Sequence, residues 1–455
     1  MDLVLQVFFV ASLLNRSLRS FLVAMSKQPR RASVPLSPLN FGDALGKQIV
    51  DLHTWVVREG LRGGDAAAIF DGLCKRFVSA GVPLWRAFVG MPTLHPQWGG
   101  YSYTWWRDLN AIEPAQFGRG HEYELILLKS PFGQLIRQVE SSGPEDNPWR
   151  YLRYRLAGPE AYLDYPILKD LAAGGATDYF AQVVGFGPNG DPSYGTGIGY
   201  SFATDLPDGF RDDDLFLLRA VLPALSLAMM THGGHMIASG LLKAYLGDDA
   251  GRRVHAGAVE RGSVESVRAV IWYADIRGFT AIADTTPGLT VIELINAIFE
   301  TLTASLRPRG GQVLKFLGDG MLAIFPFVDA TRDEICAQAI DAAAEAMHGL
   351  DTLRAERQKA GKPVAAVDLA LHLGEVLYGN VGAVDRLDFT VIGPAVNEVA
   401  RIETLCEPLG REVLISAELA SVIGESRPLE PLGEHELRGV REPRKIYALD
   451  LGRTS

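Results

Sequence analysis

A carboxylate placed directly after an apolar strand constrains this chain more than any other feature of its sequence. The β-forming run from Val270 to Tyr273 is followed by Asp275, then by Arg-Gly-Phe-Thr and a helical pattern. A second aspartate, Asp319, stands between two glycines in the stretch KFLGDGML. A buried charge is costly unless something pairs with it. One economical explanation is a metal ion held between the two aspartates; the alternative is that each merely starts a turn.

The residues from Ser263 to the C-terminus predict a β-α-β-β-α-β core with additions, which is a ferredoxin-like plan. The expected elements are a strand at 267–275, a helix at 290–306, a hairpin at 311–327, a helix at 332–356, a strand at 367–382 that ends in a further strand or tight turn, and a helix at 395–406. The predicted fold class is therefore α+β.

The preceding part of the chain predicts a second α+β module over residues 46–235. Helical spacing is interrupted at Gly63 and Gly64, strands are expected at 84–91, 179–187 and 196–206, and a helix at 210–230 closes the module. Its order resembles a GAF-like sensor domain, most clearly in SFATDLPDGFRDDDLFLL. Residues 236–262 are expected to form a helical connector, either a route for a signal or a mere spacer.

The net charge and the cysteine content exclude some classes of function and indicate a compartment. The net charge of −10 argues against a nucleic-acid-binding surface, which needs a basic stripe. The three cysteines are far apart and lack metal-binding spacing, so a reduced compartment such as the cytoplasm is expected. The apolar run LVLQVFFVASLL is only twelve residues long, too short for a membrane span. We therefore expect residues 1–45 to be a disordered or artefactual extension without a membrane anchor.

Four further residues accompany the two aspartates. Lys315 lies between Leu314 and Phe316 in a strand that runs to Asp319. Thr390 lies in LDFTVIG. Asn397 and Arg401 are four positions apart, so they share one face of a predicted helix. Taken singly, each has a plain structural explanation: an exposed lysine, a β-branched strand residue, or an ordinary polar helix face.

Taken together, these residues resemble the catalytic domain of class III adenylate/guanylate cyclases. The matching stretches are YADIRGFT, GGQVLKFLGDGMLAIF, DFTVIGPAVNEVARIE and LRGVREPRKIYAL, which cover about Ser263 to Leu449. Four motifs in the right order are a far more specific signal than a lone glycine-rich loop.

The resemblance implies a role for each matched residue. Asp275 and Asp319 would hold two Mg²⁺ ions, for which Mn²⁺ can substitute, with the Ile276 carbonyl as an added ligand. Lys315 and Thr390 would read the purine base.

For the rest of the nucleotide, the resemblance implies that Asn397 orients the ribose and that Arg401 stabilises charge on the α-phosphate in the transition state. Arg438 would hold the terminal phosphates, with Arg441 as the alternative.

The implied reaction converts ATP to 3′,5′-cyclic AMP and pyrophosphate. Guanylate cyclases of this family typically pair Glu with Cys or Ser at the base, whereas many adenylate cyclases carry Asp where this chain has Thr390. In this family the aspartates of one subunit meet the base, ribose and phosphate residues of another. The resemblance therefore implies a homodimer with shared active sites, regulated by a signal at the N-terminal domain.

Other readings stay open. A catalytically silent nucleotide-binding module should have lost a metal aspartate or the arginine, and both are present. A cyclase for GTP or a pyrimidine nucleotide is a second alternative. A diguanylate cyclase should show Gly-Gly-Asp/Glu-Glu-Phe where this chain reads LGDGML, and it is rejected. The first domain could instead carry the main function as a ligand-binding sensor, with the cyclase as its output.

Overall fold

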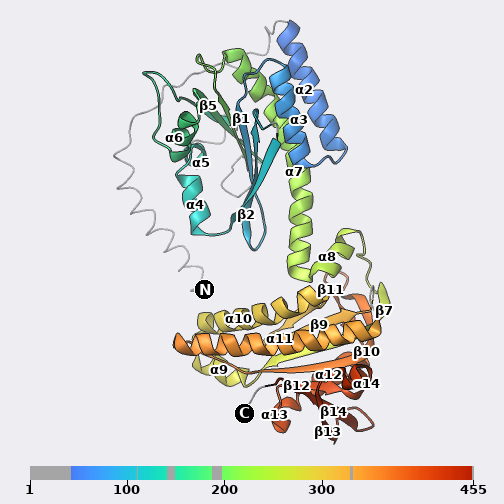
Figure 1. The fold of residues 1–455 in the computed structure, drawn as a ribbon. Helices are drawn as coiled ribbons and strands as arrows, with labels where there is room; N and C mark the ends of the chain where they lie inside the picture. The colour runs from blue at the N-terminus through green and yellow to red at the C-terminus, as the bar shows by residue number, and fades with distance from the viewer. Residues whose placement is uncertain (1–42, 110, 141–148, 187–196, 328–330, 453–455) are drawn as a thin grey trace.

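The computed structural model describes residues 43–109, 111–140, 149–186, 197–327 and 331–452 (Figure 1). The predicted extension lies outside these residues except for its last three positions, which belong to a helix that begins at Asp43. The described chain is α+β, as predicted, and contains two sheets, each with its own buried core.

The N-terminal domain is built on a six-stranded antiparallel sheet in the order β3-β2-β1-β6-β5-β4. Its strands are β1 (Arg86–Pro92), β2 (Trp98–Trp106), β3 (Ala111–Gly118), β4 (Trp149–Arg155), β5 (Asp178–Gly185) and β6 (Gly197–Thr204). The predictions of β1, β5 and β6 are confirmed, whereas β2, β3 and β4 were not predicted as strands. Aromatic residues occur on both faces of β2. The segment therefore lacks the alternation of apolar and polar residues by which a strand is recognised in a sequence.

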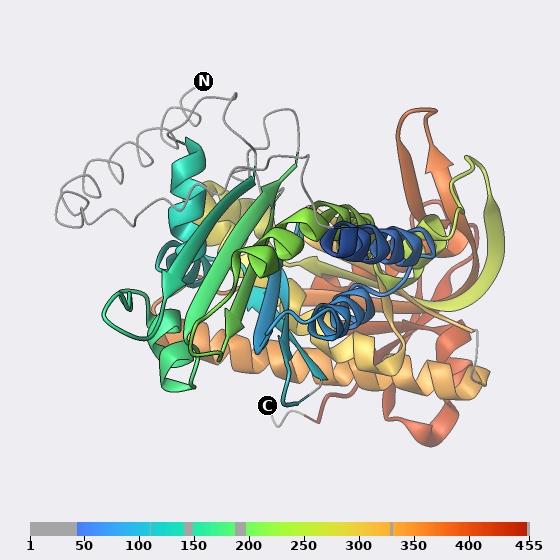
Figure 2. The ribbon, with the colours of Figure 1, turned by 90° about the horizontal axis from the view of Figure 1, so that it is seen from above.

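Helices cover both faces of this sheet (Figures 1 and 2). One core lies under α2 (Asp43–Leu61), α3 (Ala66–Ser79) and the first half of α7 (Asp212–Leu246). The other lies under α5 (Pro131–Glu140) and α6 (Pro166–Ala173), preceded by α4 (His121–Leu128). Burial of these two apolar faces accounts for the three-layer arrangement.

Helix α7 is a single element, although the sequence predicts a closing helix and a separate connector. It runs for 35 residues through Gly233 and Gly234, about 52 Å at 1.5 Å per residue. Its first half is buried in the N-terminal domain, and its second half runs to α8 (Asp248–His255) beside the C-terminal domain (Figure 1). By length and composition alone, α7 and the helical segment Gly288–Arg309 could cross a membrane, a test that buried core helices also pass.

The C-terminal sheet confirms the predicted ferredoxin-like plan. Strands β7 (Val264–Ile276), β8 (Gln312–Leu317), β9 (Gly320–Pro326) and β10 (Val367–Gly382) lie in the antiparallel order β10-β7-β9-β8. Strand β10 is continuous for 16 residues, without the tight turn that the sequence allowed. The additions are β11 (Leu387–Ile392), β12 (Val413–Ser416), β13 (Leu429–His435) and β14 (Arg444–Leu449), with β12 parallel to β10.

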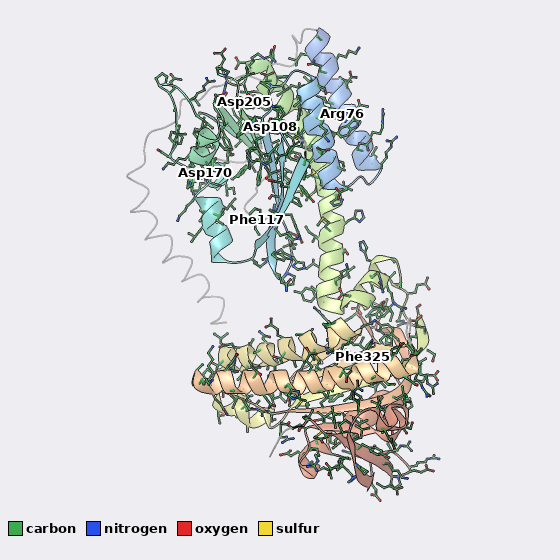
Figure 3. The ribbon with its side chains drawn as sticks, in the orientation of Figure 1. Arg76, Asp108, Phe117, Asp170, Asp205 and Phe325 are labelled. Carbon is green, nitrogen blue, oxygen red and sulfur yellow. The ribbon has the colours of Figure 1, made fainter. Side chains whose placement is uncertain are left out.

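Two long helices cover one face of this sheet, α10 (Gly288–Leu306) and α11 (Arg332–Lys359). The apolar spacing of α10 predicts its buried side, which contains Val291, Leu294, Ile298 and Leu302. A capping box between Thr331 and Glu334 starts α11. Beneath these helices Trp272 stacks on Phe325, with ring centroids 6.0 Å apart (Figure 3).

The opposite face is covered by α12 (Pro394–Glu403), which the sequence predicts as the third helix of this domain. The remaining short elements are α9 (Phe279–Thr285), η3 (Arg307–Arg309), α13 (Cys406–Leu409), α14 (Ala417–Ile423) and η4 (Gly424–Ser426).

Candidate active site

The structure brings the two predicted aspartates together. Ala274 lies opposite Met321 where β7 pairs with β9, so Asp275 at the end of β7 adjoins the turn that carries Asp319. The Oδ1 atom of Asp275 lies 3.4 Å from the point that a Cβ atom on Gly320 would occupy. The Asp275 and Asp319 carboxylates are close enough for the charge of one to affect the pKa of the other.

Electrostatics at this point favour a cation. Burial, together with the negative charge of Asp319, raises the pKa of Asp275 to about 6. A third acid, Glu403 at the end of α12, is only 8% exposed. Burial, with the charges of Asp275 and Asp368, raises the pKa of Glu403 to about 7. Carboxylate oxygens are the donors that Mg²⁺ and Mn²⁺ prefer, so the pair Asp275 and Asp319 fits a divalent ion.

An ion pair holds the loop that follows Asp275. Arg277 donates from Nε to Asp368 Oδ2 at 2.9 Å and from its terminal nitrogen to Oδ1, while its backbone N–H donates to Ala366 O at 2.9 Å. Asp368 is buried on β10, directly opposite Asp275. This bidentate contact fixes the backbone of Ile276, the last residue of β7.

Three residues at this site were not predicted from the sequence: Arg277, Asp368 and Glu403. Asp368 offered the same signal as Asp275, a lone acid among apolar strand residues. Arg277 lies inside YADIRGFT, but its partner is 91 positions away and becomes visible only in the register of β7 on β10.

The predicted base-reading pair has an unexpected neighbour. Lys315 Nζ donates to Asp388 Oδ2 at 2.7 Å, and Thr390, two residues further along β11, is buried. Asp388 and Thr390 share one face of β11, while Phe389 packs into the core on the other. The resemblance implies no role for Asp388, although the period of two along a strand places it beside Thr390.

Asn397 and Arg401 share the outer face of α12, as predicted. Val399 and Ile402 on the inner face are fully buried. Asn397 is exposed and Arg401 is half-buried. Among the described residues, neither side chain has a hydrogen bond or ion pair within the chain. Both are therefore available to a ligand or a second subunit.

Arg438 and Arg441 lie in the exposed connection between β13 and β14, anchored by buried Leu437. Within the described part of the chain, neither guanidinium has a partner. The structure does not distinguish between them as the phosphate-holding residue.

Asp275 and Thr390 are aligned with different ends of β10. Asp275 pairs with Asp368, whereas Thr390 pairs with Gly379, eleven positions further along the same strand. Thr390 is thus separated from Asp275 along the strand.

Comparison with known proteins gives the C-terminal domain its context. Residues 262–450 match the family model described as the adenylate and guanylate cyclase catalytic domain. An adenylate cyclase of Anabaena cylindrica is 33% identical over 162 residues, which are 35% of this chain and 31% of that protein. Adenylate cyclase 2 of Rhizobium meliloti (strain 1021) is 28% identical over 243 residues, which are 52% of this chain and 64% of that protein. The matches thus span less than two thirds of either relative.

A solved structure of a bacterial light-regulated adenylyl cyclase is also similar. It is 25% identical to this chain, and the alignment covers 51% of this chain and 65% of that one, with a TM-score of 0.43.

Proposed function

We propose that this chain is an adenylate cyclase, from the premise that residues 262–450 are a class III adenylate/guanylate cyclase catalytic domain. The observation that carries the proposal is the convergence of Asp275 and Asp319 in a half-buried, acid-rich position that fits divalent cations. The similar proteins from Anabaena cylindrica and Rhizobium meliloti are named adenylate cyclases, which supports ATP as the substrate.

In the proposed reaction the ribose 3′-hydroxyl attacks the α-phosphorus of ATP, and pyrophosphate leaves. Asp275 and Asp319 would hold two Mg²⁺ ions, which when bound lower the pKa of that hydroxyl and steady the triphosphate. Negative charge grows on the α-phosphate oxygens during the attack. The unpaired guanidinium of Arg401 is suited to balance this charge, and Asn397 on the same helix face is suited to orient the ribose. One of Arg438 and Arg441 would hold the leaving phosphates.

Base selection would rest on Lys315 and Thr390. The Lys315 ammonium can donate to adenine N1, and the Thr390 hydroxyl can accept from the N6 amino group. Because Asp388 already accepts a hydrogen bond from Lys315 at 2.7 Å, it would orient the ammonium toward the base. Guanine would present a donor at its N1 position, which the ammonium cannot satisfy.

The separation of Asp275 and Thr390 along β10 supports catalysis by a homodimer. One chain would supply Asp275 and Asp319, and the other would supply Lys315, Thr390, Asn397 and Arg401.

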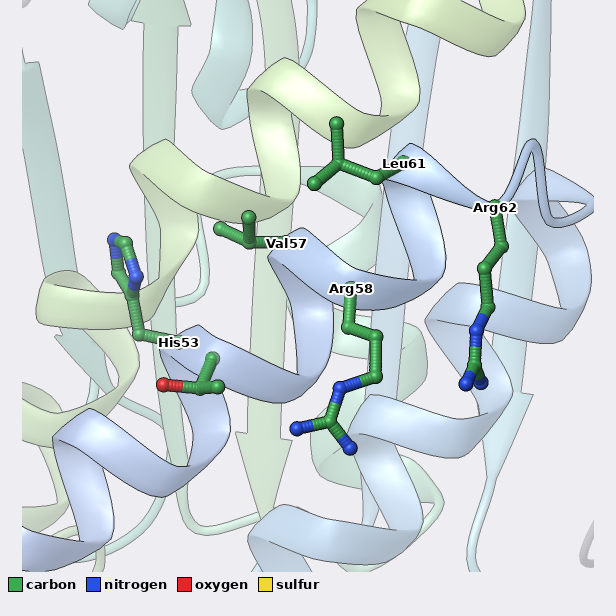
Figure 4. Close-up of a pocket in the computed structure, with 6 residues that line it drawn as sticks. His53, Val57, Arg58, Leu61 and Arg62 are labelled. Atoms are coloured by element: carbon green, nitrogen blue, oxygen red, sulfur yellow. The ribbon is translucent and has the colours of Figure 1, made fainter.

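The N-terminal domain offers a surface through which two chains could pair. Helices α2 and α7 expose Val50, Val57, Leu61, Leu227 and Met230, and α2 also lines the shallow hollow in Figure 4.

The N-terminal domain would regulate the enzyme as a GAF-like sensor, and α7 would carry the signal. Its antiparallel sheet with helices on both faces supports this assignment. At the far end of α7, the α8 residue Asp249 accepts hydrogen bonds from Arg253 at 2.7 Å and from Tyr378 of β10 at 3.2 Å. A displacement of α7 would therefore be transmitted to β10, along which Asp275 and Thr390 are aligned.

A cyclase assay with purified full-length protein tests the proposal. ATP with Mg²⁺ or Mn²⁺ should yield cyclic AMP and pyrophosphate, at a higher kcat/KM than GTP, CTP or UTP. Asp319→Ala should keep its fold and lose turnover. Equal or greater activity with GTP would contradict the substrate assignment, and absence of any cyclic nucleotide product from folded dimeric protein would favour the catalytically silent module.

A further inference from the structure

A second cluster of metal-ligand residues lies behind α12, outside the proposed active site. It consists of His372 on β10, Glu398 on α12 and Glu418 on α14. One potential ligand atom from each residue lies within 4.8 Å of the other two. Three elements far apart in sequence thus converge on one point, and the proposed cyclase reaction uses none of these side chains.

The imidazole of His372 is the unexplained group in this cluster. Its side chain is 6% exposed, and its Nδ1 atom is buried without a hydrogen-bond partner. The nearest acceptor, Glu418 Oε2, lies 3.6 Å away, which is too long for a hydrogen bond. A buried nitrogen without a partner costs about 1–3 kcal/mol. A ligand between Nδ1 and the two carboxylates would remove that cost.

The charges at this point suit a dication. Arg444 donates from Nε to Glu398 Oε1 at 2.8 Å, so one carboxylate is already oriented from outside the cluster. With a neutral imidazole, the two carboxylates and the one guanidinium leave a net charge of −1. The side chain of Glu418 is 42% exposed, which provides a route from solvent.

We propose that His372, Glu398 and Glu418 bind a divalent transition metal of the Zn²⁺ type, with water completing the coordination. One imidazole nitrogen with two carboxylate oxygens is a donor set that suits Zn²⁺ better than Mg²⁺. Ligand atoms around tetrahedral Zn²⁺ lie about 3.3 Å apart, given bonds of about 2.0 Å. The separation of 3.6 Å between Nδ1 and Oε2 is close to this value, and the other pairs need only side-chain adjustment.

A metal ion bound by His372, Glu398 and Glu418 would cross-link α12 to β10 and α14. Glu398 directly follows Asn397 on α12, so the metal would fix the helix that carries two of the residues assigned to the nucleotide. This consequence rests on the proposed function, whereas the binding itself does not.

Zinc binding by full-length protein tests the site without an activity readout. The background is Asp275→Asn with Asp319→Asn, which removes the proposed catalytic metal site. Equilibrium dialysis with Zn²⁺ followed by elemental analysis should find one equivalent per chain. Glu418→Gln and His372→Gln should each weaken binding at least tenfold, while Glu425→Gln, an exposed glutamate just after α14, should leave it unchanged.

Cobalt provides the second measurement. Co²⁺ in place of Zn²⁺ should give the visible absorption of a four- or five-coordinate site, and Glu418→Gln should abolish it. Because Glu418 is partly exposed, this variant keeps its fold even if His372→Gln does not. Stoichiometric zinc in the Glu418→Gln protein, or no bound zinc in the parent, would overturn the proposal and leave the cyclase assignment untouched.

Discussion

Asp275 and Thr390 pair with different ends of one strand: Asp275 faces Asp368, and Thr390 faces Gly379, eleven residues further along β10. No hydrogen bond or ion pair joins the two groups of site residues anywhere in the described part of the chain. The proposed function assigns these residues to two half-sites, one acidic and one that reads a purine nucleotide. The proposal that two chains complete each other's sites comes from the resemblance to class III cyclases, and this separation supports it.

The metal-free protein should lose stability as the pH rises from about 4 to about 7. The folded pKa values of Asp275 and Glu403, about 6 and about 7, exceed their ordinary values of 3.8 and 4.5. The folded state therefore binds more protons than the unfolded state across this window, and the free energy of unfolding falls with rising pH. A change of 1 kcal/mol moves the Tm of a domain this size by about 2–4 °C, which scanning calorimetry in EDTA resolves.

Mn²⁺ at pH 7.5 should restore the Tm that EDTA-treated protein has lost, since the cation offsets the clustered charges. Asp319→Asn should flatten the pH profile and abolish the Mn²⁺ response. A Tm that rises with pH over this window, or an undiminished Mn²⁺ response in Asp319→Asn, would contradict the metal assignment.

Asp368→Asn should weaken the binding of Mg²⁺ more than the binding of ATP. The substitution leaves Arg277 without its bidentate carboxylate, so we expect about 1–3 kcal/mol of lost stability. A looser loop after Asp275 should raise the Mg²⁺ concentration needed for half-maximal activity, with a smaller change in the KM for ATP. Glu430→Gln, which breaks the exposed Arg411–Glu430 pair, is the matched control and should change neither. Equal behaviour of the two variants would rule out a positioning role for Asp368.

Asp388→Asn should impair discrimination of the base. Without its partner, the Lys315 ammonium is free to adopt other rotamers, so the KM for ATP should rise about five- to tenfold, equivalent to a loss of about 1 kcal/mol. The kcat should change less, because Arg401 and the aspartates are untouched. Asp385→Asn in the same hairpin serves as the control. If kcat falls and KM stays constant, Asp388 acts on the chemistry and not on the base.

Tyr378→Phe should change the basal rate without changing the KM for ATP. The substitution removes the hydrogen bond that links β10 to Asp249 of α8. A loss of about 1 kcal/mol in one of two dimer states changes their ratio about fivefold. Tyr245→Phe, at an exposed position of α7, is the control. A basal rate within error of the parent, with the fold intact, would argue against signal transfer through this contact.

The sequence predicts those parts of the molecule that depend on residues close together in the chain. Apolar spacing predicts α10 and its buried side, and the hairpin at Gly-Asp-Gly predicts that β8 and β9 present Asp319 at a turn. Contacts that depend on strand register were not predictable. Arg277 meets Asp368, and Lys315 meets Asp388, only because distant segments pair in one sheet.

Helix α7 shows a different limit. Gly233 and Gly234 weaken the local helical preference between the predicted closing helix at 210–230 and the predicted connector at 236–262. The structure continues the helix because glycine lowers helix stability without preventing its formation, and the buried first half of α7 provides the nucleus.

The most direct test of the account is to mix two inactive variants, Asp275→Ala and Arg401→Ala, under conditions that allow subunits to exchange. Random exchange makes half of the dimers mixed, and each mixed dimer has one site with every residue intact and one site without the aspartate and the arginine. The account predicts a recovery of about one quarter of the wild-type specific activity. A mixture that stays as inactive as its parents, while labelled subunits demonstrably exchange, would contradict the claim that the two half-sites meet between chains.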